Sequence, residues 1–298
     1  MDFKIIDTQA FYHRLLETPD QAERDHLYRE GLLEPFAGLF RIFGGADPLN
    51  TAKMWTLYTP EDFANGSHPK IEALLTTLAA HDAWSKAAQA LERGRQALAP
   101  FADRLHLGTV TFALVLADLS RANPIDRGYT GFGGIPGYVL AVYSDANDYT
   151  LPRLGGACVH ELNHNIRFSI FPFNPMRVTV AEYSIAEGLA EAFAAELFGE
   201  EVIGYYVTDI NDEQLAEAKR VIGSALEVTG FNEVRSYIFG DTISTHMGRP
   251  AAGVPDFAGY AIGYRVVRQY LARAGKTVAQ ATFVPAQEII AESGFFAS

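Results

Sequence analysis

The sequence lacks most of the features that would place it in a specialised class of protein. Its 298 residues include one cysteine, Cys158, so no disulfide can form within the chain, which is compatible with a reducing compartment. No apolar run approaches the roughly 18 residues of a membrane span, and the N-terminal residues contain no apolar signal-peptide segment. We therefore expect a cytoplasmic protein without a membrane partner.

An excess of basic residues is also absent. The 24 Lys and Arg are outnumbered by 36 Asp and Glu, which gives a formal net charge of −12. This acidic balance argues against nucleic acid as the main partner. With 48% hydrophobic and 20% charged residues, the composition is that of an ordinary globular protein.

The periodicity of the apolar residues changes near residue 105. Before it, helical spacing predicts helices over 8–43 and 59–103, with a loop at 44–50. We therefore expect a helical N-terminal region, 1–104, followed by a mixed region, 105–298. The fold class predicted is α+β and predominantly helical.

Two apolar strands are expected in the mixed region, over 108–116 and 138–143. Between them lies a glycine-rich segment, 127–137, which does not match a phosphate-loop pattern. We interpret it as an edge region whose glycines let an extended peptide approach closely and add as a strand. A plain flexible hairpin is the alternative.

The most informative motif follows these strands. Residues 160–164 read His-Glu-Leu-Asn-His, within a helix predicted over about 150–168. His160 and His164 then lie one turn apart on one face and can bind one Zn²⁺. Glu161, beside the metal, can take a proton from a water that the zinc activates. The alternative is a surface helix with two solvated histidines.

The next predicted helix carries two carboxylates on one face. Thr179 and Glu182 form a capping box, and Gly199 is typical of a helix end. Glu187 and Glu191 are four residues apart on an otherwise apolar helix, so either could supply the third protein ligand of a catalytic zinc. The alternative is two glutamates on a solvated stripe, where Glu is usually found.

A family resemblance is carried by segments in a fixed order. They read CVHELNHNIR at 158–167, IAEGLAE at 185–191, FAGYAIGYR at 257–265, and PAQEII and SGF near the end. The set resembles the bacterial YjaZ-like family of predicted zinc-dependent proteases, which is described as gluzincin-like and sometimes linked to heat-shock or chaperone roles. The resemblance covers about 105–298, whereas residues 1–100 match only loosely.

The resemblance implies a zincin-like metallopeptidase domain over 105–298. The string Ala-Glu-Gly-Leu-Ala at 186–190 is similar to a segment of gluzincin aminopeptidases in which the glutamate before glycine is the third zinc ligand. This implies the ligand set His160, His164 and Glu187. Glu191 would then orient a ligating histidine through its other ring nitrogen.

A further helix, for which Asp256 is the expected cap, places Tyr260 and Tyr264 on a shared face. Hydrolysis at zinc develops an oxyanion that a phenol or an imidazolium can stabilise, and related gluzincins use Tyr or His for this. Tyr260, Tyr264 and His246 are therefore candidates, with Tyr260 placed first.

These observations predict a zinc metallopeptidase that acts on a peptide or protein substrate, with Glu161 as general base. A first alternative is a non-catalytic zinc-binding chaperone-like or regulatory protein, which a fourth protein ligand on the metal would indicate. A second is a metal-free interaction protein with a chance motif. The oligomeric state and the cleavage specificity are not specified by the sequence.

Overall fold

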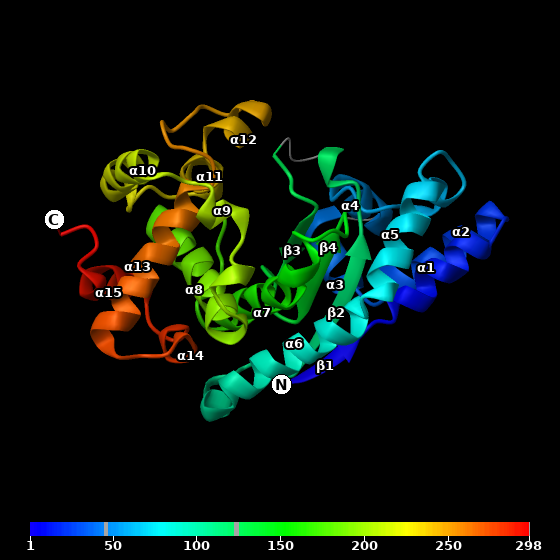
Figure 1. The fold of residues 1–298 in the computed structure, drawn as a ribbon, viewed down its shortest axis with the longest axis horizontal. Helices are drawn as coiled ribbons and strands as arrows, with labels where there is room; N and C mark the ends of the chain where they lie inside the picture. The colour runs from blue at the N-terminus through cyan, green and yellow to red at the C-terminus, as the bar shows by residue number, and fades with distance from the viewer. Residues whose placement is uncertain (45–46, 122–124, 298) are drawn as a thin grey trace. The chain divides into compact units, whose positions relative to one another are not determined.

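The computed structural model describes residues 1–44, 47–121 and 125–297 (Figure 1). Packing divides the chain into two compact units. Unit 1 contains Met1–Gln96 and Leu107–Glu161, and unit 2 contains Ala97–His106 and Leu162–Ser298. The sequence analysis expected a domain boundary after residue 104. The two units are defined by packing alone, so that boundary stays a prediction. Among the described residues, no helix combines the length and apolarity needed to cross a bilayer.

Unit 1 combines a small mixed sheet with helices. Its elements are β1 (Asp2–Ile5), α1 (Thr8–Glu17), α2 (Gln21–Tyr28), α3 (Ala37–Gly44), α4 (Pro48–Met54), α5 (His68–Ala80), α6 (Ala83–Leu98), β2 (Thr109–Leu116), β3 (Tyr129–Phe132), β4 (Tyr138–Tyr143) and the start of α7 (Leu154–Ile170). Together with the helices of unit 2 they make the fold α+β and predominantly helical, as the sequence predicts.

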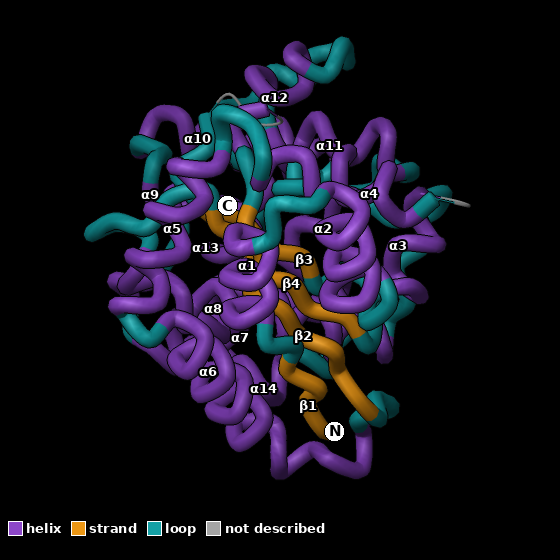
Figure 2. The backbone as a smooth tube through the Cα atoms, turned by 90° about the vertical axis from the view of Figure 1, so that its right-hand side faces the viewer, coloured by secondary structure: helices purple, strands orange, loops and turns teal. Residues whose placement is uncertain are grey.

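The four strands lie in the order β1-β2-β4-β3 (Figure 2). β1 and β4 both pair in parallel with β2, and β3 pairs antiparallel with β4, joining Tyr129 to Tyr143 and Phe132 to Leu140. β2 is buried from its second residue to its last, which agrees with the strand expected over 108–116. The glycine-rich segment therefore supplies the strand at one edge of the sheet.

The helical N-terminal region differs from the expectation at its start, which is a strand, β1, paired with β2. The helices expected over 8–43 are α1, α2 and α3. The residue before Pro19 is extended, and Asp20 caps α2 through the N–H of Glu23. The helices expected over 59–103 include α5 and α6, which are separated near Asp82, where φ is 53°.

The loop expected at 44–50 is only partly a loop. Residues from Pro48 onward form α4, because Pro is favoured in a first turn and the Asp47 side chain accepts a hydrogen bond from the N–H of Leu49 at 3.0 Å. Residues 45–46 lie outside the described part of the chain.

Unit 2 is built from helices. After the second half of α7 come α8 (Val180–Phe198), α9 (Tyr205–Thr208), α10 (Asp212–Ala225), α11 (Phe231–Phe239), α12 (Asp241–His246), α13 (Ala258–Ala274), α14 (Val278–Ala281) and α15 (Ala286–Ser293). The expected cap of α13 is wrong. Phe257 occupies the N-cap position, and the Asp256 carboxylate instead accepts a hydrogen bond from the N–H of Thr242 at 3.0 Å.

The closest helix packing in unit 2 joins α8 to α13 through two glycines. A Cβ added to Gly188 would overlap the carbonyl group of Gly263, and one added to Gly263 would overlap the carbonyl oxygen of Ser184. Both neighbours are backbone and cannot move aside as a flexible side chain would. The spacing of the two helices therefore depends on the absence of side chains at these positions.

We expect Gly188→Ala to lower the free energy of unfolding by about 1–3 kcal/mol, the usual cost of overpacking a core. Gly66→Ala is the matched control, because a methyl group there meets no atom within 4 Å. Urea denaturation followed by circular dichroism measures both variants. Equal stability of the two would show that α8 and α13 tolerate a wider separation.

Candidate metal centre

The histidine pair lies on a buried stretch of α7. Val159, just before the motif, and Leu162, within it, are fully buried, while His160 and His164 are 5% and 6% exposed. The apolar side chains that surround the pair hold the helix in the interior, so the solvated-surface alternative is wrong. The helix runs over Leu154–Ile170, close to the range expected.

Glu187 is positioned by α8, which begins as the sequence predicts. The N–H of Glu182 donates to Thr179 Oγ1 at 3.0 Å, and the N–H of Thr179 donates to Glu182 Oε2 at 2.9 Å. Glu187 and Glu191 are 5% and 2% exposed, so neither glutamate lies on a solvated stripe. Burial of two carboxylates within one helix requires partners for both.

Glu187 meets the histidines of α7. One ligand atom from each of His160, His164 and Glu187 can be chosen so that all three lie within 4.8 Å of one another, and all three residues are buried. His164 Nε2 and Glu187 Oε2 are 3.1 Å apart. Tetrahedral ligand atoms around zinc are separated by roughly 3.4 Å, given metal–ligand bonds of about 2.1 Å. The three buried donors could therefore hold a metal ion.

Glu161 lies against the edge strand of unit 1. A Cβ added to Gly131 would lie 2.5 Å from both Cγ and Oε1 of Glu161, and one added to Gly133 would overlap the Glu161 carbonyl oxygen. Glu161 is 8% exposed. The two glycines therefore let the backbone of the glycine-rich segment touch the expected general base, a contact that the sequence analysis did not foresee.

The hydrogen-bonding phase of β3 determines which residues face its open edge. The N–H of Ser144 donates to the carbonyl of Gly128 at 2.9 Å, and antiparallel partners alternate between bonded and non-bonded pairs. Thr130 and Phe132 therefore share this phase and bond to β4. Gly131 directs its backbone N–H and C=O away from β4, toward the side of β3 on which no further strand pairs among the described residues. We refer to this side as the open edge.

Glu191 forms a hydrogen bond with the backbone. Its Oε2 accepts a hydrogen bond from the N–H of Gly204 at 3.2 Å. This bond holds the turn before α9 against α8. The expected role of Glu191 in orienting a ligating histidine stays a prediction.

The three candidates for oxyanion stabilisation lie in different surroundings. The ring of Tyr260 is half-buried, with the rings of Tyr206 and Phe257 at 5.0 and 5.7 Å. The hydroxyl of Tyr264 donates to Glu200 at 2.6 Å, and burial together with this bond raises the pKa of Tyr264. His246 is exposed at the end of α12.

Two further residues of the motif region stabilise unit 2. Asn163 donates to the hydroxyl of Thr282 at 2.9 Å, and Arg167 donates to the carbonyls of Thr282 and Val284 at 2.9 and 3.0 Å. Burial lowers the pKa of Arg167 to about 10. These bonds tie α7 to the connection between α14 and α15. The sequence indicated both residues only as part of the resemblance, because their partners are more than a hundred positions away.

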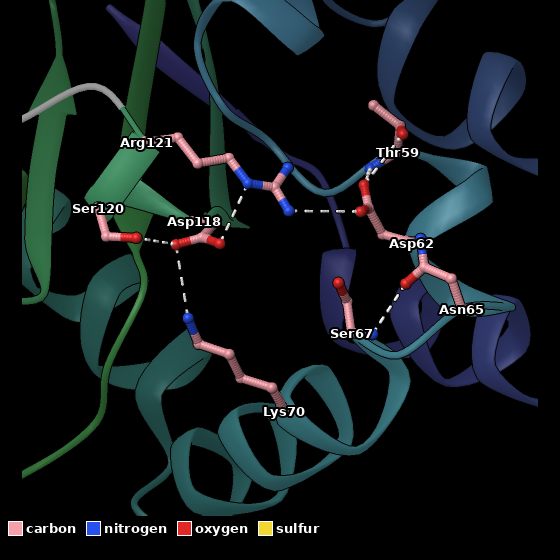
Figure 3. Close-up of polar contacts among 8 residues, drawn as sticks. All are labelled: Thr59, Asp62, Asn65, Ser67, Lys70, Asp118, Ser120 and Arg121. Carbon is pink, nitrogen blue, oxygen red and sulfur yellow. Dashed lines mark hydrogen bonds and ion pairs between the residues drawn. The ribbon is translucent and has the colours of Figure 1, made fainter.

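A second polar cluster lies at the carboxyl end of β2 (Figure 3). Asp118 accepts from Ser120 at 2.6 Å and pairs with Arg121 and Lys70 at 3.1 and 3.5 Å, beside a hollow of about 690 Å³. Burial opposes ionisation of Asp118, but Ser120 and the two cations outweigh it and lower its pKa. Because these charges balance one another, the cluster explains local structure better than it explains a reaction.

Comparison with known proteins agrees with the geometry. A family model described as "Predicted Zn-dependent protease (DUF2268)" matches residues 83–291. The chain belongs to this family of predicted zinc-dependent proteases. The match includes every segment of the metal centre and supports the resemblance to YjaZ-like proteins.

A full-length relative is known in Bacillus subtilis (strain 168). It is described as "Uncharacterized protein YjfC" and is 34% identical over 311 residues, covering all of both chains. No solved structure matches the chain. Membership therefore establishes the family, while the chemistry has to be argued from the site.

We expect Glu187→Ala to lose stoichiometric zinc, because two imidazoles alone leave a catalytic zinc one protein ligand short. Glu191→Ala should keep the site but weaken zinc binding about tenfold to a hundredfold, if Glu191 orients a ligand. Elemental mass spectrometry after dialysis measures zinc per chain, and competition with a chelator measures affinity. Wild-type zinc content in Glu187→Ala would exclude this ligand set.

Proposed function

We propose that the protein is a zinc-dependent metallopeptidase with a zincin-like fold. The observation that carries this proposal is the buried cluster of His160, His164 and Glu187 with Glu161 beside it against an edge strand. A metal site, a carboxylate base and an open strand edge are the three parts that peptide hydrolysis requires. The substrate class proposed is an extended peptide or an unfolded segment of a protein.

The three donors suit zinc because they combine two neutral imidazoles with one carboxylate, as catalytic zinc sites do. Among residues 1–44, 47–121 and 125–297, the cluster has three His, Cys, Asp or Glu members and not four. A zinc ion held there would supply a Lewis acid that polarises a carbonyl and lowers the pKa of a water molecule.

Glu161 has the position of the general base. It accepts the proton of the attacking water and later donates it to the leaving amine. Its burial against Gly131 and Gly133 keeps the carboxylate close to where a peptide on the edge strand would lie.

Tyr260 is favoured over Tyr264 by the hydrogen bond that Tyr264 already makes. Gly263 contacts α8, and the two tyrosines lie on one side of α13, about 40° apart around its axis. The hydroxyl of Tyr264 is bonded to Glu200. We therefore assign the oxyanion role to the Tyr260 hydroxyl.

The zincin-like fold is supported by the order of the elements. An antiparallel edge strand, β3, is followed by an inner strand, β4, and then by the helix that carries the motif. This order places the open edge next to Glu161. The alternative, a non-catalytic zinc protein with a chaperone-like or regulatory role, would need neither a buried Glu161 nor an open edge beside it.

Glu161→Gln should retain about one zinc per chain while hydrolysis falls by at least a factor of about a hundred, because an amide cannot accept the proton. Glu213→Gln, an exposed change on α10, is the control. Turnover of a quenched-fluorescence peptide library and zinc content are measured together. Full activity in Glu161→Gln would exclude Glu161 as the base.

Tyr260→Phe should lower kcat by about a hundredfold with little change in KM, since an oxyanion donor acts only in the transition state. Tyr264→Phe should leave kcat within a few fold. Steady-state kinetics on one cleaved peptide compare the two. A larger loss in Tyr264→Phe would reverse the assignment.

A further inference from the structure

An aromatic cluster in unit 1 lies at the end of the edge strand nearest Glu161. The rings of Phe43, Trp55 and Phe132 contact one another in every pair, with centroids 5.1, 5.6 and 4.9 Å apart. They come from α3, from the residue after α4, and from the last residue of β3. We refer to these three rings as the aromatic ledge.

The ledge is partly open to solvent. Phe43 is 42% exposed. Ile42, which precedes Phe43, and Met54, which precedes Trp55, are 60% and 58% exposed. These are three of the six large hydrophobic residues that stand exposed within the described part of the chain. Apolar side chains gathered in this way generally mark a surface that another molecule covers.

The ledge and Glu161 lie on opposite faces of β3. Successive side chains of a strand alternate between faces. The Cβ direction of Gly131 points at Glu161, so the neighbouring Phe132 points to the other face, where it meets Phe43 and Trp55. A peptide paired with β3 would therefore present alternate side chains to the catalytic group and to the ledge.

The alternation of hydrogen-bonded and non-hydrogen-bonded pairs along β3 determines which peptide residue would lie opposite the ledge. An antiparallel peptide would exchange both backbone hydrogen bonds with Gly131, whose N–H and C=O face the open edge. The preceding peptide residue then lies opposite Phe132 in a non-hydrogen-bonded pair, in which side chains approach most closely. Glu161 lies against Gly131, so we expect the cleaved bond on one side or the other of the peptide residue opposite Gly131. The residue opposite Phe132 is then one of the two that precede that bond.

We propose that the aromatic ledge is a specificity subsite that selects substrates with a large apolar side chain at one of the two positions before the cleaved bond. This inference rests on the proposed peptidase function and adds its substrate preference. The occupant is the side chain of an extended peptide, because the ledge is continuous with the strand edge that such a peptide would extend. Aromatic and branched aliphatic side chains are favoured there, since they bury apolar area and form cross-strand pairs with Phe132.

The test compares peptides that differ at a single position. Zinc-loaded wild type is given matched peptides with Phe, Leu, Ser or Asp at each position near the cut, and mass spectrometry of the products locates the cleaved bond. The inference expects kcat/KM about tenfold or more higher for Phe and Leu than for Ser at one of the two preceding positions. Phe43→Ala should reduce that preference to about twofold. Met176→Ala, which removes an 81% exposed side chain elsewhere, should leave it unchanged.

Failure of the inference can be separated from failure of the proposed function. Hydrolysis without an apolar preference, or a preference that Phe43→Ala leaves intact, overturns the ledge while the peptidase stands. If wild type binds zinc but cleaves no peptide, the proposed function fails. Calorimetric measurement of peptide binding to Glu161→Gln then tests whether the aromatic ledge binds apolar side chains. Apolar peptides that bind at least fivefold more weakly to Glu161→Gln with Phe43→Ala support it, and equal binding overturns it.

Discussion

The burial of the Glu187 carboxylate is the constraint on which the candidate centre depends. Desolvation of an isolated carboxylate costs several kcal/mol even after the protein relaxes, and Glu187 is 5% exposed. Its oxygen lies 3.1 Å from His164 Nε2, so the charge is compensated by the imidazoles or by a metal that all three bind. Because α7 and α8 are mostly apolar around these donors, the three polar side chains have to satisfy one another or bind a common metal ion.

Close backbone approach is the second requirement, and glycines meet it on both sides of the centre. Gly188 follows Glu187 directly and lets α13 touch α8. Gly131 and Gly133 let the edge strand and its following turn touch Glu161. An added methyl group would meet backbone atoms at Gly188 and Gly133, and the Glu161 side chain at Gly131. The glycines near the motif therefore serve packing first, and flexibility is not needed to explain them.

Local rules were sufficient to predict most of the centre. The i, i+4 spacing placed His160 and His164 on one face, and the capping box at Thr179 located the start of α8. β4 was predicted because its residues are apolar throughout. The choice between Glu187 and Glu191 needed the family resemblance, because both are buried on one helix and differ only in what they meet.

Features set by distant partners could not be predicted. β1 is a strand only because it pairs with β2, more than a hundred residues later. The break between α5 and α6 depends on a positive φ at Asp82, which the sequence does not signal. The start of α13 at Ala258 follows a left-handed Phe257, a conformation that tertiary packing has to impose on a bulky residue.

The position of Glu161 is the strongest argument for catalysis over a structural metal site. A structural zinc needs a closed shell of protein donors, and residues between the ligands are free to be apolar or exposed. Here the residue between the ligands is a carboxylate that is 8% exposed and contacts the strand edge. Keeping a carboxylate out of water costs stability, which a purely structural site has no reason to incur. The proposed peptidase function accounts for this cost, because it needs a proton acceptor beside an extended peptide.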